Sequence, residues 1–211
     1  MESLAALASS LTLALCTCQA TCDARTQLDG LPLCHALIRL LANGRPLAQA
    51  ELAQVTGLAP RQLAEKIAGM ELDYDDAGRV IGAGLSLRPT PHQFEINGHA
   101  LFTWCALDAL MYPSLLGQTV QVESPCRATG RRVKVTVTPQ GLTAVDPPEA
   151  VVSLVAAERG RPSRQSFCGA VHFFGCAAAA QPWLAEHPPA RVVPVATAYA
   201  LGNLLIAKRG V

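Results

Sequence analysis

The strongest constraint on the fold is a change in hydrophobic period near residue 101. Downstream of it, "RVKVTVT" (132–138) places three valines on one face and a lysine and two threonines on the other. Such alternation is typical of a half-buried β-strand, and "TVQVES" (119–124) shows it too. Further strand patterns lie in "LTAV", "AVVSLVA" and "FCGAVHFF", and two helical patterns close the chain, "AAAAQPWLAEH" and "VATAYALGNLLIAK". We therefore expect residues 101–211 to form a mostly antiparallel sheet with flanking helices, an α+β fold.

Upstream of residue 101 the patterns are mainly helical. "LPLCHALIRLLANGRP" predicts a helix that stops at Asn43-Gly44, and "LAQAELAQVTGLAPRQLAEKIAGM" predicts helix, turn and helix. Two short strand patterns follow, in "GRVIGAGLSLR" and "HQFEI". Three helices followed by a hairpin is the order of a winged helix-turn-helix. We predict three units: a Cys-containing N-terminal leader over 1–29, a winged-helix-like domain over 30–100 and the α+β domain over 101–211.

The charge pattern argues against nucleic acid as a partner. The net charge is only +1, and a polyanion-binding chain normally carries a basic patch. The second helix of the helix-turn-helix offers Arg61 and Lys66, but it runs into the acidic "ELDYDDAG" (71–78), which would repel phosphate. We favour a structural role for this unit, with a thiol-rich winged-helix metal sensor that regulates transcription as the alternative.

The N-terminal segment decides the expected compartment. No apolar run reaches the roughly 20 residues that a membrane-spanning helix needs. "MESLAALASSLTLALC" has the length of a signal peptide, but its only charge is Glu2, where a secretory leader carries Lys or Arg. We interpret residues 4–15 as an amphipathic helix of a cytoplasmic protein that does not use a membrane, with a signal peptide as the alternative.

The cysteine count is high for a cytoplasmic chain. Eight cysteines are spread irregularly over 211 residues, unlike the framework of a disulfide-stapled mini-domain. Thiols in a reducing compartment indicate metal chemistry, thiol catalysis or simple burial. The N-terminal group does not match the spacing of structural zinc sites, so inert packing and a loose trap for soft metals stay equal alternatives. That group comprises Cys16, Cys18, Cys22 and Cys34, with His35 beside it.

One thiol and one carboxylic acid stand close together in the apolar segment "FTWCALDALMYP" (102–113). We expect a buried amphipathic helix ended by Pro113, on which Cys105 and Asp108, three positions apart, share a face. A buried carboxyl group is costly unless it is paired or functional, and burial favours its protonated form. The alternative, which spacing alone favours, is an exposed Asp108 beside a buried Cys105.

Two further cysteines lie in the second half of the chain. "RQSFCGAVHFF" predicts Cys168 in an apolar strand, on the same face as Ala170 and His172. We expect His172 to be a hydrogen-bonded structural residue. Cys126, in "ESPCRATGRRV", is expected in a turn. The chain has no G-x-S-x-G, Walker, G-x-G-x-x-G or H-E-x-x-H motif.

Several stretches occur together and in order as in one known family: "LLANGRPL", "DDAGRVIGAGLSLRPTPHQFEI", "LFTWCALDALMYPSLLGQTVQVESPCRATG", "VSLV" and "RQSFCGAVHFF". Over roughly residues 30–176 the chain resembles the bacterial organomercurial (alkylmercury) lyases. That family cleaves the carbon–mercury bond to give a hydrocarbon and Hg(II). Its fold, a winged-helix-like domain before a mixed sheet domain, agrees with the patterns above. Many members carry a second cysteine where this chain has Gly169.

The resemblance implies a role for each matching residue. Cys105 matches a thiol that captures mercury, Cys168 the second mercury-binding thiol and Asp108 the acid that shuttles protons. Cys126 matches a structural cysteine. The resemblance further implies no organic cofactor, Hg(II) held as product until small cellular thiols release it, and a mercuric reductase as downstream partner.

The expected chemistry suits these groups, because mercury is soft and prefers thiolates to oxygen or nitrogen ligands. Two thiolates push electron density onto the carbon, and a carboxyl group donates the proton as general acid. Trp104 and Phe167, each next to one of the two thiols, are expected to keep the site dry. A mercury-sequestering protein without turnover is a third, weaker hypothesis.

Overall fold

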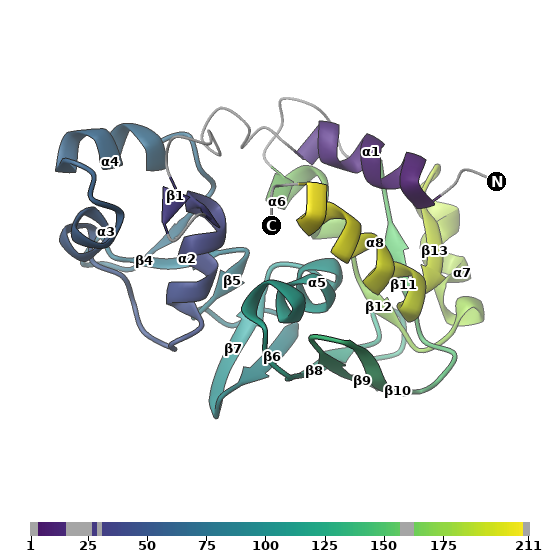
Figure 1. Ribbon diagram of the computed structural model, residues 1–211. Coiled ribbons are helices and arrows are strands. Elements are labelled where there is room, and N and C mark those ends of the chain that lie inside the picture. Colours follow the sequence, from purple (N-terminus) through teal and green to yellow (C-terminus); the bar gives the residue numbers. More distant parts are fainter. Residues whose placement is uncertain (1–3, 16–26, 29–30, 157–162, 209–211) are drawn as a thin grey trace.

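The computed structural model describes residues 4–15, 27–28, 31–156 and 163–208 (Figure 1). The helices are α1 (Leu4–Leu15), α2 (Leu33–Leu41), α3 (Gln49–Thr56), α4 (Pro60–Ile67), α5 (Ala106–Leu116), α6 (Ser163–Ser166), α7 (Ala177–Glu186) and α8 (Val195–Lys208), with a 3₁₀ turn, η2, at Cys168–Ala170. The strands are β1 (Gln27–Leu28), β2 (Leu31–Pro32), β3 (Asp73–Tyr74), β4 (Val80–Ala83), β5 (Leu85–Ser86), β6 (His92–Ile96), β7 (His99–Thr103), β8 (Val120–Pro125), β9 (Arg132–Thr138), β10 (Gly141–Asp146), β11 (Val151–Leu154), β12 (Phe173–Phe174) and β13 (Arg191–Pro194).

An eight-stranded sheet runs through the middle of the molecule. Its strand order is β10-β9-β8-β6-β7-β5-β4-β3, and neighbouring strands are antiparallel. In β9 the three valines lie on the buried face and pair with β8, where Val135 stands opposite Val122 and Val137 opposite Val120. A smaller antiparallel sheet has the order β12-β11-β13. The α+β prediction with a mostly antiparallel sheet is confirmed.

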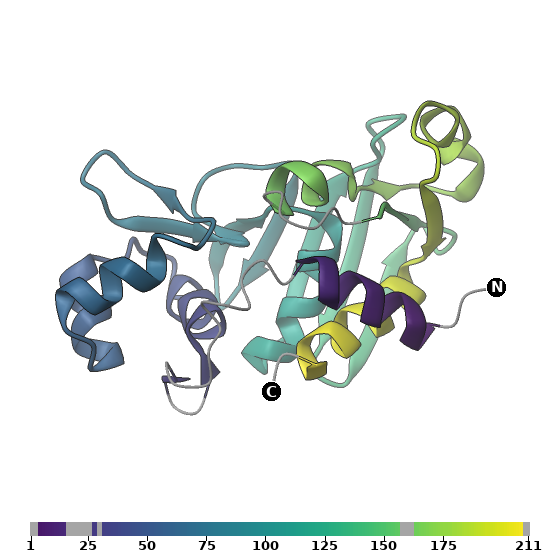
Figure 2. The ribbon, with the colours of Figure 1, turned by 90° about the horizontal axis from the view of Figure 1, so that it is seen from above.

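Helix α5 is the centre of the core. It packs against the large sheet on one side and α8 on the other, where Gly202 lets α8 approach so closely that a Cβ there would lie 2.6 Å from Met111 Cβ. The predicted N-terminal helix is confirmed as α1, which lies along α8 with Ala8 and Leu11 buried (Figures 1 and 2). Among the described residues, no helix combines the length and apolar character needed to cross a membrane.

Two local predictions are wrong. The helix expected over 102–113 begins only at Ala106, since β7 runs to Thr103, and Pro113 lies inside it rather than ending it. An internal proline costs a helix about 3 kcal/mol, but α5 is buried on nearly every side, so tertiary packing outweighs that cost. The helix ends instead at Gly117, whose φ of 66° is left-handed.

The other error concerns Cys168, which lies in the 3₁₀ turn η2 and not in a strand. The turn is closed by hydrogen bonds from Ala170 N to Phe167 O and from Val171 N to Cys168 O. The apolar run therefore covers two kinds of structure, because only its last part, β12, pairs with β11. The alternation of faces inferred for Cys168 and His172 does not apply.

The helices and strands predicted upstream of residue 101 are present as α2, α3, α4 and β4 to β6. The hairpin expected between the two strand patterns is wrong, because β6 pairs with β7 and β8 while β5 pairs with β4 and β7. Helices α2, α3 and α4 and strand β4 lie at one end of the molecule, with β13 and α7 at the other, whereas β6 lies in the middle of the large sheet (Figures 1 and 2). The large sheet continues through β7, which contains the expected boundary at residue 100, so the division into domains stays a prediction. Cys16, Cys18 and Cys22 lie outside the described residues.

Candidate functional site

The passage from β7 into α5 presents Cys105 and Asp108. Cys105 is the N-cap of α5, with an extended backbone (φ −149°, ψ 170°), and Asp108 lies in the first helical turn. The Cys105 thiol donates a hydrogen bond to Asp108 Oδ2 at 3.2 Å. Thr103 Oγ1 donates to the Cys105 carbonyl, which steadies the turn. The predicted proximity is therefore present, although it comes from a helix cap rather than from two positions within a helix.

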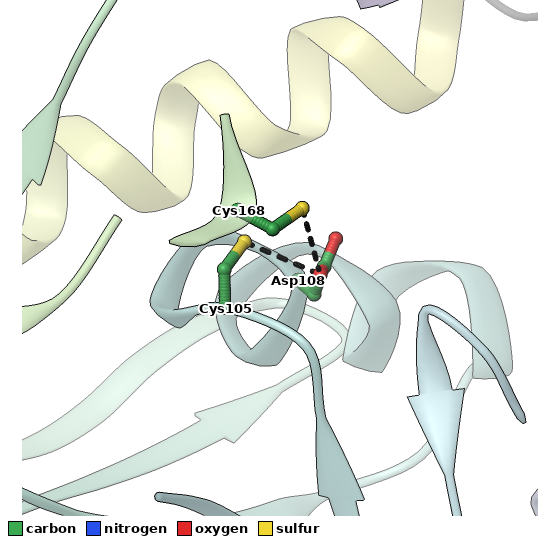
Figure 3. A group of neighbouring side chains, drawn as sticks. All are labelled: Cys105, Asp108 and Cys168. Carbon is green, nitrogen blue, oxygen red and sulfur yellow. Dashed lines mark hydrogen bonds between the residues drawn. The ribbon is translucent and has the colours of Figure 1, made fainter. Parts of the chain in front are cut away.

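Cys168 reaches the same carboxylate from a different part of the chain. Its Sγ lies 4.0 Å from Asp108 Oδ2 (Figure 3). The two segments are joined directly, because Ala106 N donates to the Val171 carbonyl just after η2. The two sulfur atoms and a carboxylate oxygen all lie within 4.8 Å of one another. Within the described part of the chain, this is the one group of three such side chains close enough to hold a metal ion.

Tyr112 completes the surroundings of the carboxylate, and sequence reasoning missed it. Its hydroxyl donates to Asp108 Oδ1 at 3.1 Å, one helical turn further along α5. The signal was the i, i+4 spacing from Asp108. Gly84 makes room for the ring, because a Cβ there would lie 2.0 Å from the Tyr112 hydroxyl.

All three groups are buried: Cys105 is 1% exposed, Cys168 7% and Asp108 8%. Burial, with the nearby Cys168 thiol and Asp108 charge, raises the pKa of Cys105 well above its ordinary value. For Cys168, a hydrogen bond with Cys105 acts to lower the pKa, but burial and the Asp108 charge outweigh it, and the pKa is raised. Both thiols therefore stay protonated near neutral pH until a ligand such as a soft metal displaces the proton.

A cavity of about 130 Å³ opens onto the site. Asp108 and Cys168 line it, whereas the buried Cys105 is not part of its lining. The apolar part of its wall includes Phe167, which is 2% exposed, and Trp104. Both aromatic residues thus stand where the sequence placed them, beside the thiols. The half-buried Cys34, with His35, also lines this cavity, along with Ile38, Gly69, Met70, Glu71, Ala83, Gly84, Leu107, Met111, Tyr112, Ser163, Leu205 and Ile206.

The other predicted residues lie away from the thiol site. Cys126 is buried in the turn between β8 and β9, as expected. Burial acts to raise its pKa, but hydrogen bonds with the Thr129 side chain and the backbone of Gly175, Thr129 and Ala128 lower it. His172 stacks on His92 and meets Trp183 edge-on, and burial lowers its pKa to about 4.

Known proteins resemble this chain over most of its length. The family model for alkylmercury lyase (MerB) matches residues 85–207. An alkylmercury lyase of Streptomyces lividans is 47% identical over 174 residues, which cover 82% of this chain and 81% of the relative. One of Staphylococcus epidermidis is 42% identical over 177 residues, 83% of this chain and 82% of the relative. A third, of Pseudomonas putida, is 43% identical over 175 residues.

A solved structure has the same fold. The crystal structure of the mercury-bound form of MerB2 matches with a TM-score of 0.78, covering 95% of this chain and 99% of that one. Its sequence identity is 23%, so the likeness speaks to the fold.

Proposed function

Since this chain belongs to the alkylmercury lyase family, we propose that Cys105, Asp108 and Cys168 carry out its carbon–mercury cleavage. The chain is an organomercurial lyase, and the relatives support this enzyme over a transcriptional regulator. The observation that supports the choice of residues is the convergence of two thiols and one carboxylate within 4.8 Å. No organic cofactor enters the proposed reaction.

Capture of the substrate is the first step. An organomercurial arrives bound to a small cellular thiol, and one protein thiol replaces that ligand. The new sulfur–mercury bond forms as the old one breaks, and the displaced thiol leaves with the proton. The apolar wall of the cavity receives the organic group, and exclusion of water there strengthens the electrostatic interactions of the site.

Cleavage follows when the second thiol binds the same mercury. Its proton passes to Asp108, and the resulting thiolate raises the electron density on the carbon. Asp108 then gives this proton to the carbon, so the electron pair of the carbon–mercury bond becomes a carbon–hydrogen bond. The hydrocarbon leaves, and Hg(II) remains between the sulfurs of Cys105 and Cys168. Asp108 suits the transfer, because its Oδ2 faces both sulfurs while Tyr112 holds the other oxygen.

Release of Hg(II) completes the cycle. Small cellular thiols exchange for the protein thiols, and a mercuric reductase is the proposed downstream acceptor. Both steps suit a cytoplasmic enzyme, because that compartment supplies reduced thiols.

For the N-terminal part, we infer a winged-helix-like unit with a structural role. Helices α2, α3 and α4 are followed by the β3–β4 hairpin, and the backbone of Leu47 pairs with Val80. The Arg61 side chain on α4 pairs with Glu65 of the same helix. A surface with that charge balance supports the proposal that nucleic acid is not a partner.

The decisive experiment follows hydrocarbon release. Purified protein is mixed with phenylmercury and excess small thiol, and benzene is measured by headspace gas chromatography. We expect many turnovers per chain, and none with Cys105→Ser or Cys168→Ser. Cys176→Ser is the matched control, because Cys176 is half-buried at the start of α7. Full turnover in either site variant would refute the mechanism. Tight mercury binding without benzene would favour a sequestering protein.

A further inference from the structure

Two carboxylates from the N-terminal part hold the start of the segment that carries Cys168. Glu71, just before β3, accepts hydrogen bonds from Ser163 N at 2.7 Å, from Ser163 Oγ and from Arg164 N at 3.1 Å. Asp73, in β3, forms an ion pair with the Arg164 guanidinium. These contacts join parts of the chain more than 90 positions apart.

The Asp73 carboxylate also holds the segment that carries the other thiol. Its Oδ2 accepts a hydrogen bond from Trp104 Nε1 at 3.1 Å, and Trp104 immediately precedes Cys105. The Arg164 guanidinium lies over the Trp104 ring, 4.7 Å from its centroid. Asp73 is 8% exposed, so its carboxylate is poorly solvated, whereas the Arg164 side chain is 40% exposed. The hydrogen bonds that Asp73 accepts are charge-assisted, and such bonds are stronger than neutral ones.

We propose that Glu71 and Asp73 are positioning residues for the lyase reaction: they hold Cys168 at the distance from Cys105 and Asp108 that two-thiol mercury binding requires. This inference rests on the proposed function. The N-terminal part then contributes to catalysis indirectly, because neither carboxylate touches the reacting atoms.

The need for such positioning follows from where the three groups stand. Cys105 and Asp108 are fixed by one sheet strand and one buried helix. Cys168 stands instead on a four-residue helix and a 3₁₀ turn. Short segments of this kind have little stability of their own. The hydrogen bonds of Glu71 and Asp73 reach the first turn of that segment, and Cys168 follows four residues after Arg164.

Gly82 is part of the same arrangement. A Cβ at this position would lie 2.7 Å from Asp73 Oδ2, the atom that accepts from Trp104. The strand β4 therefore leaves space for the carboxylate to face Trp104 and Arg164.

The test separates positioning from folding with two independent readouts. Glu71→Ala, Glu71→Gln and Asp73→Asn are compared with Glu65→Gln, which removes an exposed carboxylate of the same part of the chain. The first readout is kcat and KM for benzene release, per mercury-titrated site. The second is the rate at which N-ethylmaleimide alkylates Cys168 relative to Cys105, measured by mass spectrometry.

We expect kcat to fall roughly 10-fold in Glu71→Ala and Asp73→Asn. Removal of a group bonded directly to a metal ligand costs up to about 100-fold, and these carboxylates act one step further away. Glu71→Gln should recover part of that loss, because it keeps one oxygen acceptor. Alkylation of Cys168 should become faster in the Glu71→Ala variant while that of Cys105 changes little, because the hydrogen bonds of Glu71 go to Ser163 and Arg164. Glu65→Gln should match the wild type in both readouts.

Unchanged kcat and unchanged alkylation in folded Glu71→Ala would overturn the proposal. If that variant does not fold, the same two results in Glu71→Gln and Asp73→Asn decide. Failure of the proposed function looks different: the wild type would then release no benzene, while the alkylation ratio would still report whether the carboxylates hold Cys168.

Discussion

Replacing Gly84 by alanine tests how firmly the Asp108 carboxylate is held. Gly84 has a φ of +86°, and a Cβ there would lie 2.0 Å from the Tyr112 hydroxyl and 3.0 Å from Tyr112 Cζ. The left-handed backbone costs alanine roughly 1–2 kcal/mol. The contact with the hydroxyl must also be relieved, and a shift of Tyr112 breaks its hydrogen bond to Asp108.

The loss of the hydrogen bond from Tyr112 to Asp108 contributes more than the backbone strain. A hydrogen bond to a charged group contributes about 1.5–3 kcal/mol. Gly84→Ala should therefore lower the free energy of unfolding by about 2.5–5 kcal/mol. Tyr112→Phe alone should lose only the hydrogen bond. The double variant loses that bond once, so its destabilisation should fall short of the sum of the single variants by about 1.5–3 kcal/mol.

Urea denaturation of the four proteins measures this cycle, and benzene release by the same samples measures its effect on catalysis. Gly78→Ala is the matched control, because Gly78 has a φ of +72° but nothing within 4 Å of the added Cβ. It should show the backbone cost alone, with normal turnover. Additive destabilisation in the double variant, or equal losses in Gly84→Ala and Gly78→Ala, would refute the reasoning.

Three further predictions concern protons. Asp108→Asn keeps the shape of the side chain but cannot carry a proton, so benzene release should fall at least about 100-fold while gel-filtered protein still binds mercury; undiminished turnover would exclude the shuttle. Burial raises the pKa of Cys105 above its ordinary value of 9.0. As the pH rises past 9, this thiol therefore ionises in unfolded chains before it does in folded ones, and the free energy of unfolding declines, less so in Cys105→Ser. Urea titrations from pH 7 to pH 10 check this. Burial lowers the pKa of His92 from 6.5 to about 3, so stability should be lost as the pH falls through that window, and acid titration of His92→Gln should show a shallower loss.

The sequence predicted best where local pattern and burial coincide. Val133, Val135 and Val137 alternate because one face of β9 lies on the core, so the local pattern and the burial agree. The prediction that the helix ends at Pro113 failed, because a helix buried on nearly all sides tolerates a proline that an exposed helix would not. Apolar character alone could not separate these two situations.

The site shows the same contrast. Cys105, Asp108 and Cys168 were named as a set through the family resemblance, since spacing alone favoured an exposed Asp108, and the structure brings them together. Their supporting contacts were not predicted. Glu71 was counted only as acid that would repel phosphate, yet it holds Ser163, which lies 92 positions further along the chain. Hydrogen bonds across such separations have no local periodicity, so nothing in the neighbouring residues indicates them.

The placement of the two thiols on segments far apart in the sequence has a thermodynamic consequence. Hg(II) bound by both sulfurs would act as a cross-link between the cap of α5 and η2, and it would restrict the unfolded chain as a disulfide does. The product complex should then be the most heat-resistant form in the cycle. Each turnover would have to remove Hg(II) and so break this cross-link. When competing thiols are scarce, release of Hg(II) to them, rather than cleavage of the carbon–mercury bond, would limit the turnover rate.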